Sequence, residues 1–266
     1  MRSGQHKETS LSGRFEVARN PTSSDSVAIV FEDVIKRFRI TRTEKEQFLS
    51  LLSRKYRRSM DTALALNRIN LSVNRGEAIN IVGKDGAGKT TLLNLVSGVL
   101  LPTYGKIAVN GNVKVSAVST LGFDPSLSGL ANLYLKALHL GLNQQKAKEI
   151  VPKAVEFSEL GDLINEPYRT LRKAHRARLV PAFVLSMELD ILLIDGGIHG
   201  GDKNFTQKCL KRLDELMADD KTTVLFTSFA PAMERTALQR AIILNKGKLV
   251  FDGGMGKASE SFKTLI

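Results

Sequence analysis

The octapeptide Gly83-Lys84-Asp85-Gly86-Ala87-Gly88-Lys89-Thr90 constrains the fold of this chain more than any other segment. It matches the pattern Gly-x-x-x-x-Gly-Lys-Thr of the phosphate-binding P-loop, in which glycines let successive backbone N–H groups point at phosphate oxygens. We expect Lys89 to reach the β- and γ-phosphates of a nucleoside triphosphate and the Thr90 hydroxyl to ligate Mg²⁺. The predicted nucleotide-binding residues here are Gly83, Asp85, Gly86, Ala87, Gly88, Lys89, Thr90 and Thr91.

The segments on either side of the octapeptide agree with this interpretation. Residues 77–82 form a short apolar run typical of a strand. Downstream, apolar residues recur at helical spacing, and the helix should end before Pro102. These residues are Leu92, Leu93, Val96, Val99 and Leu100. A strand, a glycine loop and a helix N-terminus together direct backbone dipoles at an anion. The alternative, a glycine turn between unrelated elements, would not need this context.

Composition describes an ordinary globular chain. It has 266 residues, of which 42% are hydrophobic and 25% charged. No apolar stretch approaches the ~20 residues that span a bilayer, and the first residues lack the apolar core of a signal peptide. The single cysteine, Cys209, excludes an intrachain disulfide and fits a reducing cytoplasm. Because Cys209 shares a helical pattern with Phe205 and Leu213, we predict a buried apolar role rather than a reactive thiol.

Positive charge is concentrated in one segment. The net charge is +12, and residues 36–58 hold nine Lys or Arg against two Glu. Such a segment can face anionic lipid headgroups or an acidic protein surface, or it can be a solvated face with no specific partner. No aromatic pattern of a nucleic-acid module interleaves it, so we expect no nucleic-acid partner.

The chain divides into a tail and one folded domain. Residues 1–26 are polar and lack periodicity, and we expect them to be a disordered tail. Residues 27–266 then form a strand-rich part to about residue 112, a helical lobe at about 115–187, and strands at 191–195, 224–228 and 241–244. The last strand should form a hairpin with 249–251. Strands that alternate with helices predict an α/β fold with a mainly parallel core sheet.

Asp195 is the candidate partner of the P-loop in metal binding. It ends the apolar run Ile191-Leu192-Leu193-Ile194. An aspartate at such a strand end can hold Mg²⁺, often through water, opposite Thr90. The four histidines are scattered without metal-ligand spacing, so no other metal site is expected.

These motifs and several longer segments resemble the nucleotide-binding subunit of an ABC transporter, most of all those that export bacterial polysaccharides such as capsule, O-antigen and teichoic acid. The matching segments include residues 63–71, 88–93, 122–129 and 190–195. The run Gly122-Phe123-Asp124-Pro125-Ser126-Leu127-Ser128-Gly129 is the most distinctive, since most other ABC subunits lack it.

The resemblance implies a fold, cofactors and partners. The fold would be the P-loop NTPase nucleotide-binding domain, with a mainly parallel core sheet, an antiparallel β subdomain and a helical subdomain. The cofactors would be ATP and Mg²⁺, and Phe38 would stack on adenine; a core phenylalanine is the alternative. A membrane permease subunit would dock near residues 115–140. A nucleotide-binding homodimer or heterodimer would form on the inner face of the bacterial cytoplasmic membrane.

Four positions depart from the family pattern. Gly196 stands where the family carries the glutamate that polarises water, and Phe229 stands where a histidine contacts the γ-phosphate. The signature segment aligns with Leu171-Arg172-Lys173-Ala174-His175, and residues 112–123 contain no Gln or Glu. A general base contributes typically 10²–10⁴-fold in rate, so we expect ATP binding with weak or absent hydrolysis and assign no catalytic residue.

Two functions remain open. The chain is either the ATP-binding subunit of a polysaccharide exporter or a non-transporting pseudo-ATPase that senses nucleotide and regulates polysaccharide biosynthesis or export. A P-loop kinase is disfavoured, because the segment between the P-loop and Asp195 follows the transporter pattern at many points. Whether the chain is an enzyme stays undecided at this stage.

Overall fold

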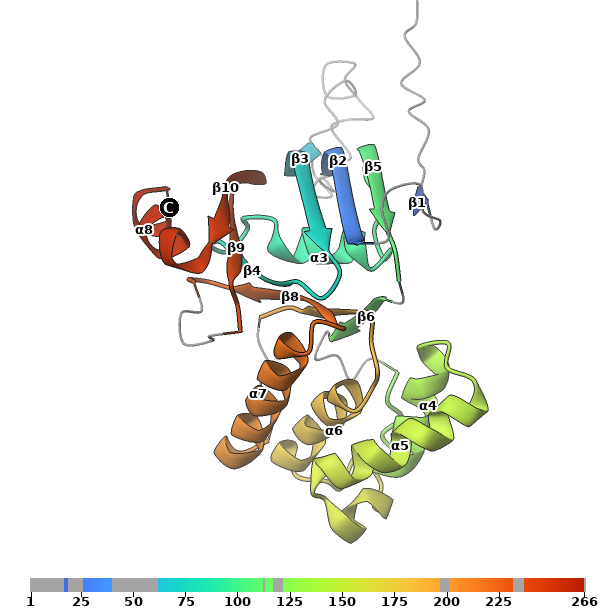
Figure 1. Ribbon diagram of the computed structural model, residues 1–266. Coiled ribbons are helices and arrows are strands. Elements are labelled where there is room, and N and C mark those ends of the chain that lie inside the picture. Colours follow the sequence, from blue (N-terminus) through green and yellow to red (C-terminus); the bar gives the residue numbers. More distant parts are fainter. Residues whose placement is uncertain are drawn as a thin grey trace, which may run out of the picture.

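The computed structural model describes residues 17–18, 26–39, 62–111, 113–116, 122–196, 201–231 and 237–265, with the backbone alone for 17–18 and 113–116 (Figure 1). Most of the tail predicted for residues 1–26, and residues 40–58 of the basic segment, lie outside this part. Within it, no helix is both long and apolar enough to cross a membrane.

A six-stranded sheet forms the centre of the molecule. Its order is β10-β9-β4-β8-β7-β6, and every pair is parallel except β9 with β10. The strands are β4 (Ala78–Val82), β6 (Val113–Ser116), β7 (Ile191–Ile194), β8 (Thr223–Ser228), β9 (Arg240–Asn245) and β10 (Lys248–Gly254). The predicted strands and the closing hairpin are confirmed.

Both faces of this sheet are buried, as the apolar runs of parallel strands require. Successive side chains of a strand point to opposite faces. In β4, Ile79 and Ile81 belong to one core, whereas Ala78 and Val82 belong to the other. The sheet therefore separates two hydrophobic cores.

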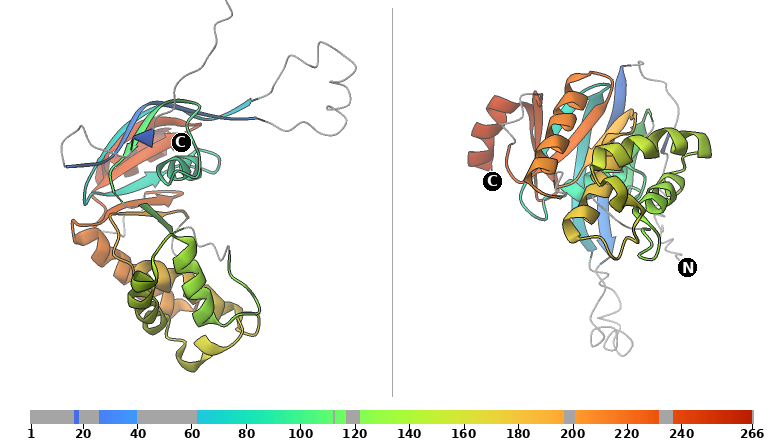
Figure 2. Two further views of the ribbon diagram at one scale, coloured as in Figure 1. Left: turned by 90° about the vertical axis from the view of Figure 1, so that its right-hand side faces the viewer. Right: turned by 90° about the horizontal axis from the view of Figure 1, so that it is seen from below.

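The first core lies between the central sheet and a smaller one. The smaller sheet has the order β1-β5-β2-β3, with β2 antiparallel to both neighbours. Its strands are β1 (Val17–Ala18), β2 (Val27–Arg39), β3 (Thr62–Asn74) and β5 (Tyr104–Val109). Helix α3 (Lys89–Val96) buries Leu92, Leu93, Leu95 and Val96 in the same core and packs against β3, β5 and β8 (Figure 2).

The helix after the P-loop is shorter than its apolar spacing predicts. It ends at Val96, and Gly98 adopts a left-handed conformation with φ 76°. A helix cannot continue through such a residue. Val99 and Leu100, which we expected within the helix, therefore lie beyond its end, still before Pro102.

The second core holds the helices on the other face. Between β6 and β7 the chain forms α4 (Gly129–His139), α5 (Gln144–Ser158), a short 3₁₀ helix η1 (Gly161–Asn165) and α6 (Lys173–Leu185). Helix α7 (Lys203–Ala218) follows β7, and α8 (Met255–Leu265) follows β10 (Figure 1). Side chains cap three of these helices: Ser128 accepts from the Ala131 amide, Asn143 from Lys146, and Asp202 from Phe205. The predicted α/β fold with an antiparallel sheet and added helices is confirmed.

Cys209 lies in α7 and is fully buried, as predicted. Burial raises the pKa of its thiol to about 12. A protonated, enclosed thiol is a small apolar side chain, and it is not a nucleophile.

Candidate nucleotide site

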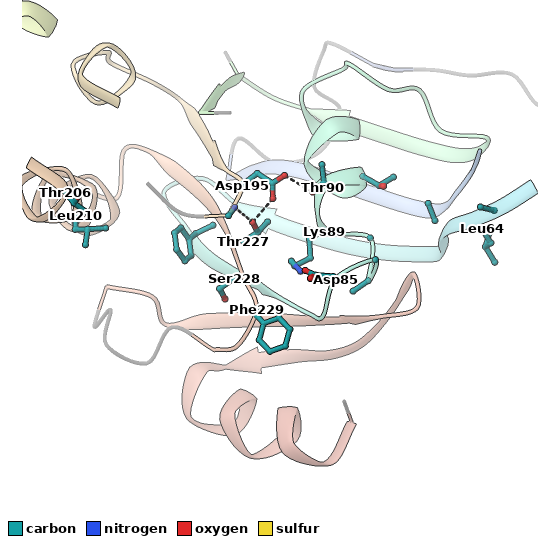
Figure 3. Close-up of a pocket in the computed structure, with 18 residues that line it drawn as sticks. Leu64, Asp85, Lys89, Thr90, Asp195, Thr206, Leu210, Thr227, Ser228 and Phe229 are labelled. Carbon is teal, nitrogen blue, oxygen red and sulfur yellow. Dashed lines mark hydrogen bonds between the residues drawn. The ribbon is translucent and has the colours of Figure 1, made fainter. Parts of the chain in front are cut away.

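A pocket of about 850 Å³ opens where β4, β7 and β8 end. Because these strands are parallel, their carboxyl ends meet at one edge of the sheet, where ligands of open α/β sheets bind. The lining residues come from β3, the P-loop, β7, β8 and α7 (Figure 3). They are Ala63, Leu64, Ala65, Asp85, Gly86, Ala87, Gly88, Lys89, Thr90, Thr91, Asp195, Gly196, Thr206, Leu210, Phe226, Thr227, Ser228 and Phe229.

Most of the residues predicted from the octapeptide line this pocket. Gly83 does not: it begins the loop, and its carbonyl accepts a hydrogen bond of 2.5 Å from the Lys89 ammonium. The Lys89 ammonium also donates to the Lys84 carbonyl at 3.1 Å, so it lies across the loop. This places a positive charge at the mouth of an anion-binding turn.

Gly88 is required by both its conformation and its surroundings. Its φ is 108°, which side-chain-bearing residues rarely adopt. A Cβ atom there would lie 2.7 Å from Leu66 Cδ2 and 2.8 Å from the Ala65 carbonyl oxygen. Helix α3 starts at the next residue, so the loop places the helix N-terminus directly at the pocket.

Thr90 and Asp195 are brought together as predicted. The Thr90 hydroxyl donates to Asp195 Oδ2 at 2.7 Å. A hydroxyl that donates its proton to a carboxylate keeps both lone pairs for a cation, and Mg²⁺ prefers such oxygen ligands. The residues therefore fit an Mg²⁺ ion that also binds nucleotide phosphates. No group of three or more His, Cys, Asp or Glu that could hold a metal alone is found in the described part of the chain.

Phe38 lies outside the pocket. It pairs across β2 and β3 with Ala63, which lines the pocket, and its ring is 38% exposed with the Lys36 ammonium 5.1 Å from the ring centroid. That exposure argues against the alternative of a core phenylalanine. The adenine-stacking role stays a prediction.

Two of the four departures lie in the pocket wall. Gly196 has φ 74°, and a Cβ atom added there would meet nothing within 4 Å. The space beside the P-loop is therefore open at the position where the resemblance would place a glutamate. Phe229 is 58% exposed and packs its ring edge-on against Phe262 of α8. An apolar ring cannot supply the hydrogen bond that a histidine would make there.

The segment aligned with the signature lies at the start of α6. Arg172 is the N-cap, and its side chain makes no capping hydrogen bond. Arg172 and Lys173 are exposed, and neither lines the pocket. Cations at the positive end of a helix dipole are unfavourable, in contrast to the small polar residues that caps prefer.

Asp202 connects α7 with α6. It caps α7, and Arg178 of α6 forms an ion pair with it. The N–H of Phe205 and then the Arg178 guanidinium hold the Asp202 pKa below its usual value. Arg178 also donates to the Ser158 carbonyl at 3.1 Å, which joins α5 to the same contact.

Several residues of the pocket wall were not predicted from the sequence. Phe226, Thr227 and Ser228 line the pocket because parallel pairing places β8 beside both β4 and β7. Thr206 and Leu210 line it from α7. The one sequence signal that could have pointed to the wall residues of β8 is the pair of hydroxyl side chains, Thr227 and Ser228, that follows an apolar run directly before Phe229.

Comparison with known proteins assigns the family. The family model described as "ABC transporter" matches residues 66–197. The chain is 34% identical over 241 residues to the teichoic acids export ATP-binding protein TagH of Staphylococcus haemolyticus, covering 91% of this chain and 90% of that protein. It is 32% identical over 240 residues to TagH of Bacillus cereus, but spans only 43% of that longer protein.

Solved structures share the fold at low sequence identity. The dimeric ATP-binding cassette MJ0796, bound to ADP and Pi, has a TM-score of 0.65 and 18% identity, covering 85% of this chain and 98% of that one. The cbiO1 structure from Clostridium perfringens has a TM-score of 0.62 and 17% identity, covering 91% and 94%. The relatives therefore place this chain in the ABC transporter family, and the two named above are teichoic acids export ATP-binding proteins.

Proposed function

We propose that this chain is the ATP-binding subunit of a polysaccharide export system and that it binds Mg-ATP with weak or no hydrolysis. The observation that carries the proposal is the composition of one pocket. Lys89, Thr90 and Asp195, which we expect to bind phosphate and Mg²⁺, line it next to Gly196 and Phe229. The first three residues support binding, whereas Gly196 offers no base and Phe229 no polar contact to a γ-phosphate.

The roles of the chain's own residues follow from this arrangement. The P-loop N–H groups and Lys89 would bind the phosphates, while Thr90 and Asp195 would hold Mg²⁺. The ion would neutralise phosphate charge when bound. At Gly196 no side chain can accept a proton from water, so water activation loses the 10²–10⁴-fold that a general base typically supplies.

The export role draws on the teichoic acid relatives and on the loop before α4. Asn132 is fully buried and binds this loop from within. Its amide donates to the Asp124 carbonyl at 2.9 Å and to the Ser128 carbonyl at 3.0 Å, and its carbonyl accepts from the Asp124 N–H at 2.6 Å. The loop is thus stiff and leaves Leu127 exposed. A rigid loop with an apolar tip suits docking to a membrane permease subunit, as expected near residues 115–140.

The proposal extends to assembly and location. We expect a homodimer or heterodimer of nucleotide-binding chains, held by the permease at the inner face of the bacterial cytoplasmic membrane. The basic segment 36–58 would then lie near anionic headgroups.

Calorimetric titration tests the nucleotide site. Wild type should bind ATP in the presence of Mg²⁺, and Lys89→Ala should weaken that affinity by at least tenfold. Lys106→Ala, on an exposed position of β5, should leave it unchanged. Phosphate release at the turnover of an ordinary ABC ATPase would contradict the weak-hydrolysis part, and equal affinity of Lys89→Ala and wild type would contradict the site itself.

Affinity purification from membranes distinguishes the two functions. Recovery of a polytopic membrane protein with the tagged chain, lost in Leu127→Asp, supports export. Recovery of a soluble biosynthetic enzyme instead would favour the pseudo-ATPase sensor, since no permease contact would then exist.

A further inference from the structure

Thr227 is a polar residue where an apolar one is expected. It is 1% exposed and continues the buried run Val224-Leu225-Phe226 of β8. Valine has nearly the same shape and would fill this position without a buried hydroxyl. Burying a hydroxyl costs free energy unless it is hydrogen-bonded, so its partners reveal what the hydroxyl does.

The Thr227 hydroxyl has two partners, and together they determine its direction. The Gly196 N–H lies 2.7 Å from Thr227 Oγ1, and Asp195 Oδ1 lies 2.7 Å from it on the other side (Figure 3). A backbone N–H can only donate, so the hydroxyl accepts from Gly196. Its single proton must then point at Asp195.

The Asp195 carboxylate is consequently held at both oxygens. Thr227 donates to Oδ1 and Thr90 donates to Oδ2, each at 2.7 Å. Three successive hydrogen bonds, from Gly196 through Thr227 and Asp195 to Thr90, link β7 and β8 to the first turn of α3. It sets the orientation of the carboxylate relative to the Thr90 hydroxyl.

We propose that Thr227 is a positioning residue for the Mg²⁺ site: it orients Asp195 so that the carboxylate and Thr90 together favour Mg-bound nucleotide over metal-free nucleotide. Residues that hydrogen-bond to metal ligands in this way typically contribute 10–100-fold to metal affinity. This inference rests on the proposed binding of Mg-ATP. It predicts that the effect of Thr227 appears in the metal dependence of binding and not in nucleotide binding as such.

The experiment uses the full chain with three substitutions. Thr227→Val removes the hydroxyl at constant shape, and Thr227→Ser restores it. Thr223→Val is the matched control, because Thr223 lies in the same strand, is also 1% exposed, and accepts from the Gly76 N–H at 3.0 Å away from the pocket. ATP affinity is measured by calorimetry with Mg²⁺ and with EDTA, and folding by thermal unfolding.

We expect Thr227→Val to weaken ATP binding about tenfold with Mg²⁺ and less than twofold with EDTA. Thr227→Ser should bind within twofold of wild type under both conditions. Thr223→Val should lower the melting temperature while keeping the wild-type ratio of the two affinities.

Other outcomes would distinguish a failure of the positioning role of Thr227 from a failure of the proposed Mg-ATP binding. If wild type binds ATP and Thr227→Val keeps the wild-type ratio, the positioning role is wrong while the proposed function stands. An equal loss with and without Mg²⁺, shared by Thr223→Val, would show that both threonines only stabilise the strand. Folded wild type that binds no ATP at all would overturn both proposals.

Discussion

The ring of Phe229 packs edge-on against the ring of Phe262, with the centroids 6.3 Å apart and the planes at 73°. Phe229 lines the nucleotide pocket, and Phe262 belongs to the last helix, α8. Phe229, where the resemblance would place a histidine, is therefore contacted from outside the pocket by α8.

This pair predicts a measurable coupling. Edge-to-face aromatic pairs contribute about 0.5–1.5 kcal/mol beyond their buried area. A double-mutant cycle of Phe229→Ala and Phe262→Ala, measured by urea unfolding, should show a coupling in that range. The cycle of Phe229→Ala with Leu265→Ala, an exposed residue of the same helix, should be additive. Additivity in both cycles would mean that the ring contact contributes nothing.

The open space at Gly196 predicts that a carboxylate can be added. Gly196→Glu should raise phosphate release by about tenfold, less than the 10²–10⁴-fold that a general base typically supplies, because Phe229 and the segment 171–175 would still not supply the family's histidine and signature. Gly196→Gln has the same shape but no base and should show no gain. Both should lose roughly 1–2 kcal/mol of stability, because φ 74° strains any residue with a Cβ atom. Identical rates for the two variants would exclude base catalysis from this position.

Arg178 and Arg212 each form an ion pair with an acidic side chain, and we expect the two ion pairs to contribute differently to the free energy of unfolding. The Arg178 side chain is 14% exposed, pairs with Asp202, and lies with its guanidinium 5.0 Å from the Phe205 ring centroid. Arg178→Met should lower the free energy of unfolding by about 2–3 kcal/mol, since partly buried charged hydrogen bonds are lost. The Arg212 side chain is 41% exposed and pairs with Glu215 one helical turn away. Arg212→Met should cost less than about 0.5 kcal/mol. Equal losses in denaturant titrations would refute this ranking.

The buried thiol of Cys209 predicts a specific alkaline instability. Burial raises the thiol pKa from 9.0 to about 12 in the folded chain. Between these values the unfolded state releases the proton and the folded state retains it, so stability falls as pH rises above 9 and is unaffected below it. The slope is at most about 1.4 kcal/mol per pH unit. Unfolding of wild type and Cys209→Ala, compared from pH 8 to 10.5, should diverge only above 9. Parallel curves over the whole range would show that the thiol does not contribute.

The local conformation around the P-loop was determined by the sequence alone. Glycines at 83, 86 and 88, an apolar run before them and a helical pattern after them are all neighbours in the chain, so short-range sterics and hydrogen bonding suffice to predict a strand, loop and helix. The burial of Cys209 and the β9–β10 hairpin were predictable for the same reason, since both depend on periodicity over a few residues.

The tertiary structure alone decided which further side chains join Asp195, whose place opposite Thr90 was predicted from the sequence. Thr227 reaches Asp195 only because parallel pairing places β8 beside both β4 and β7, which are far apart in the sequence. The direction of the Thr227 hydroxyl depends on a backbone amide in a neighbouring strand, and the placement of Phe229 depends on Phe262. The spacing of residues along the chain carries no information on such contacts, because they arise from the order of the strands in the sheet and from the packing of helices that are distant in the sequence.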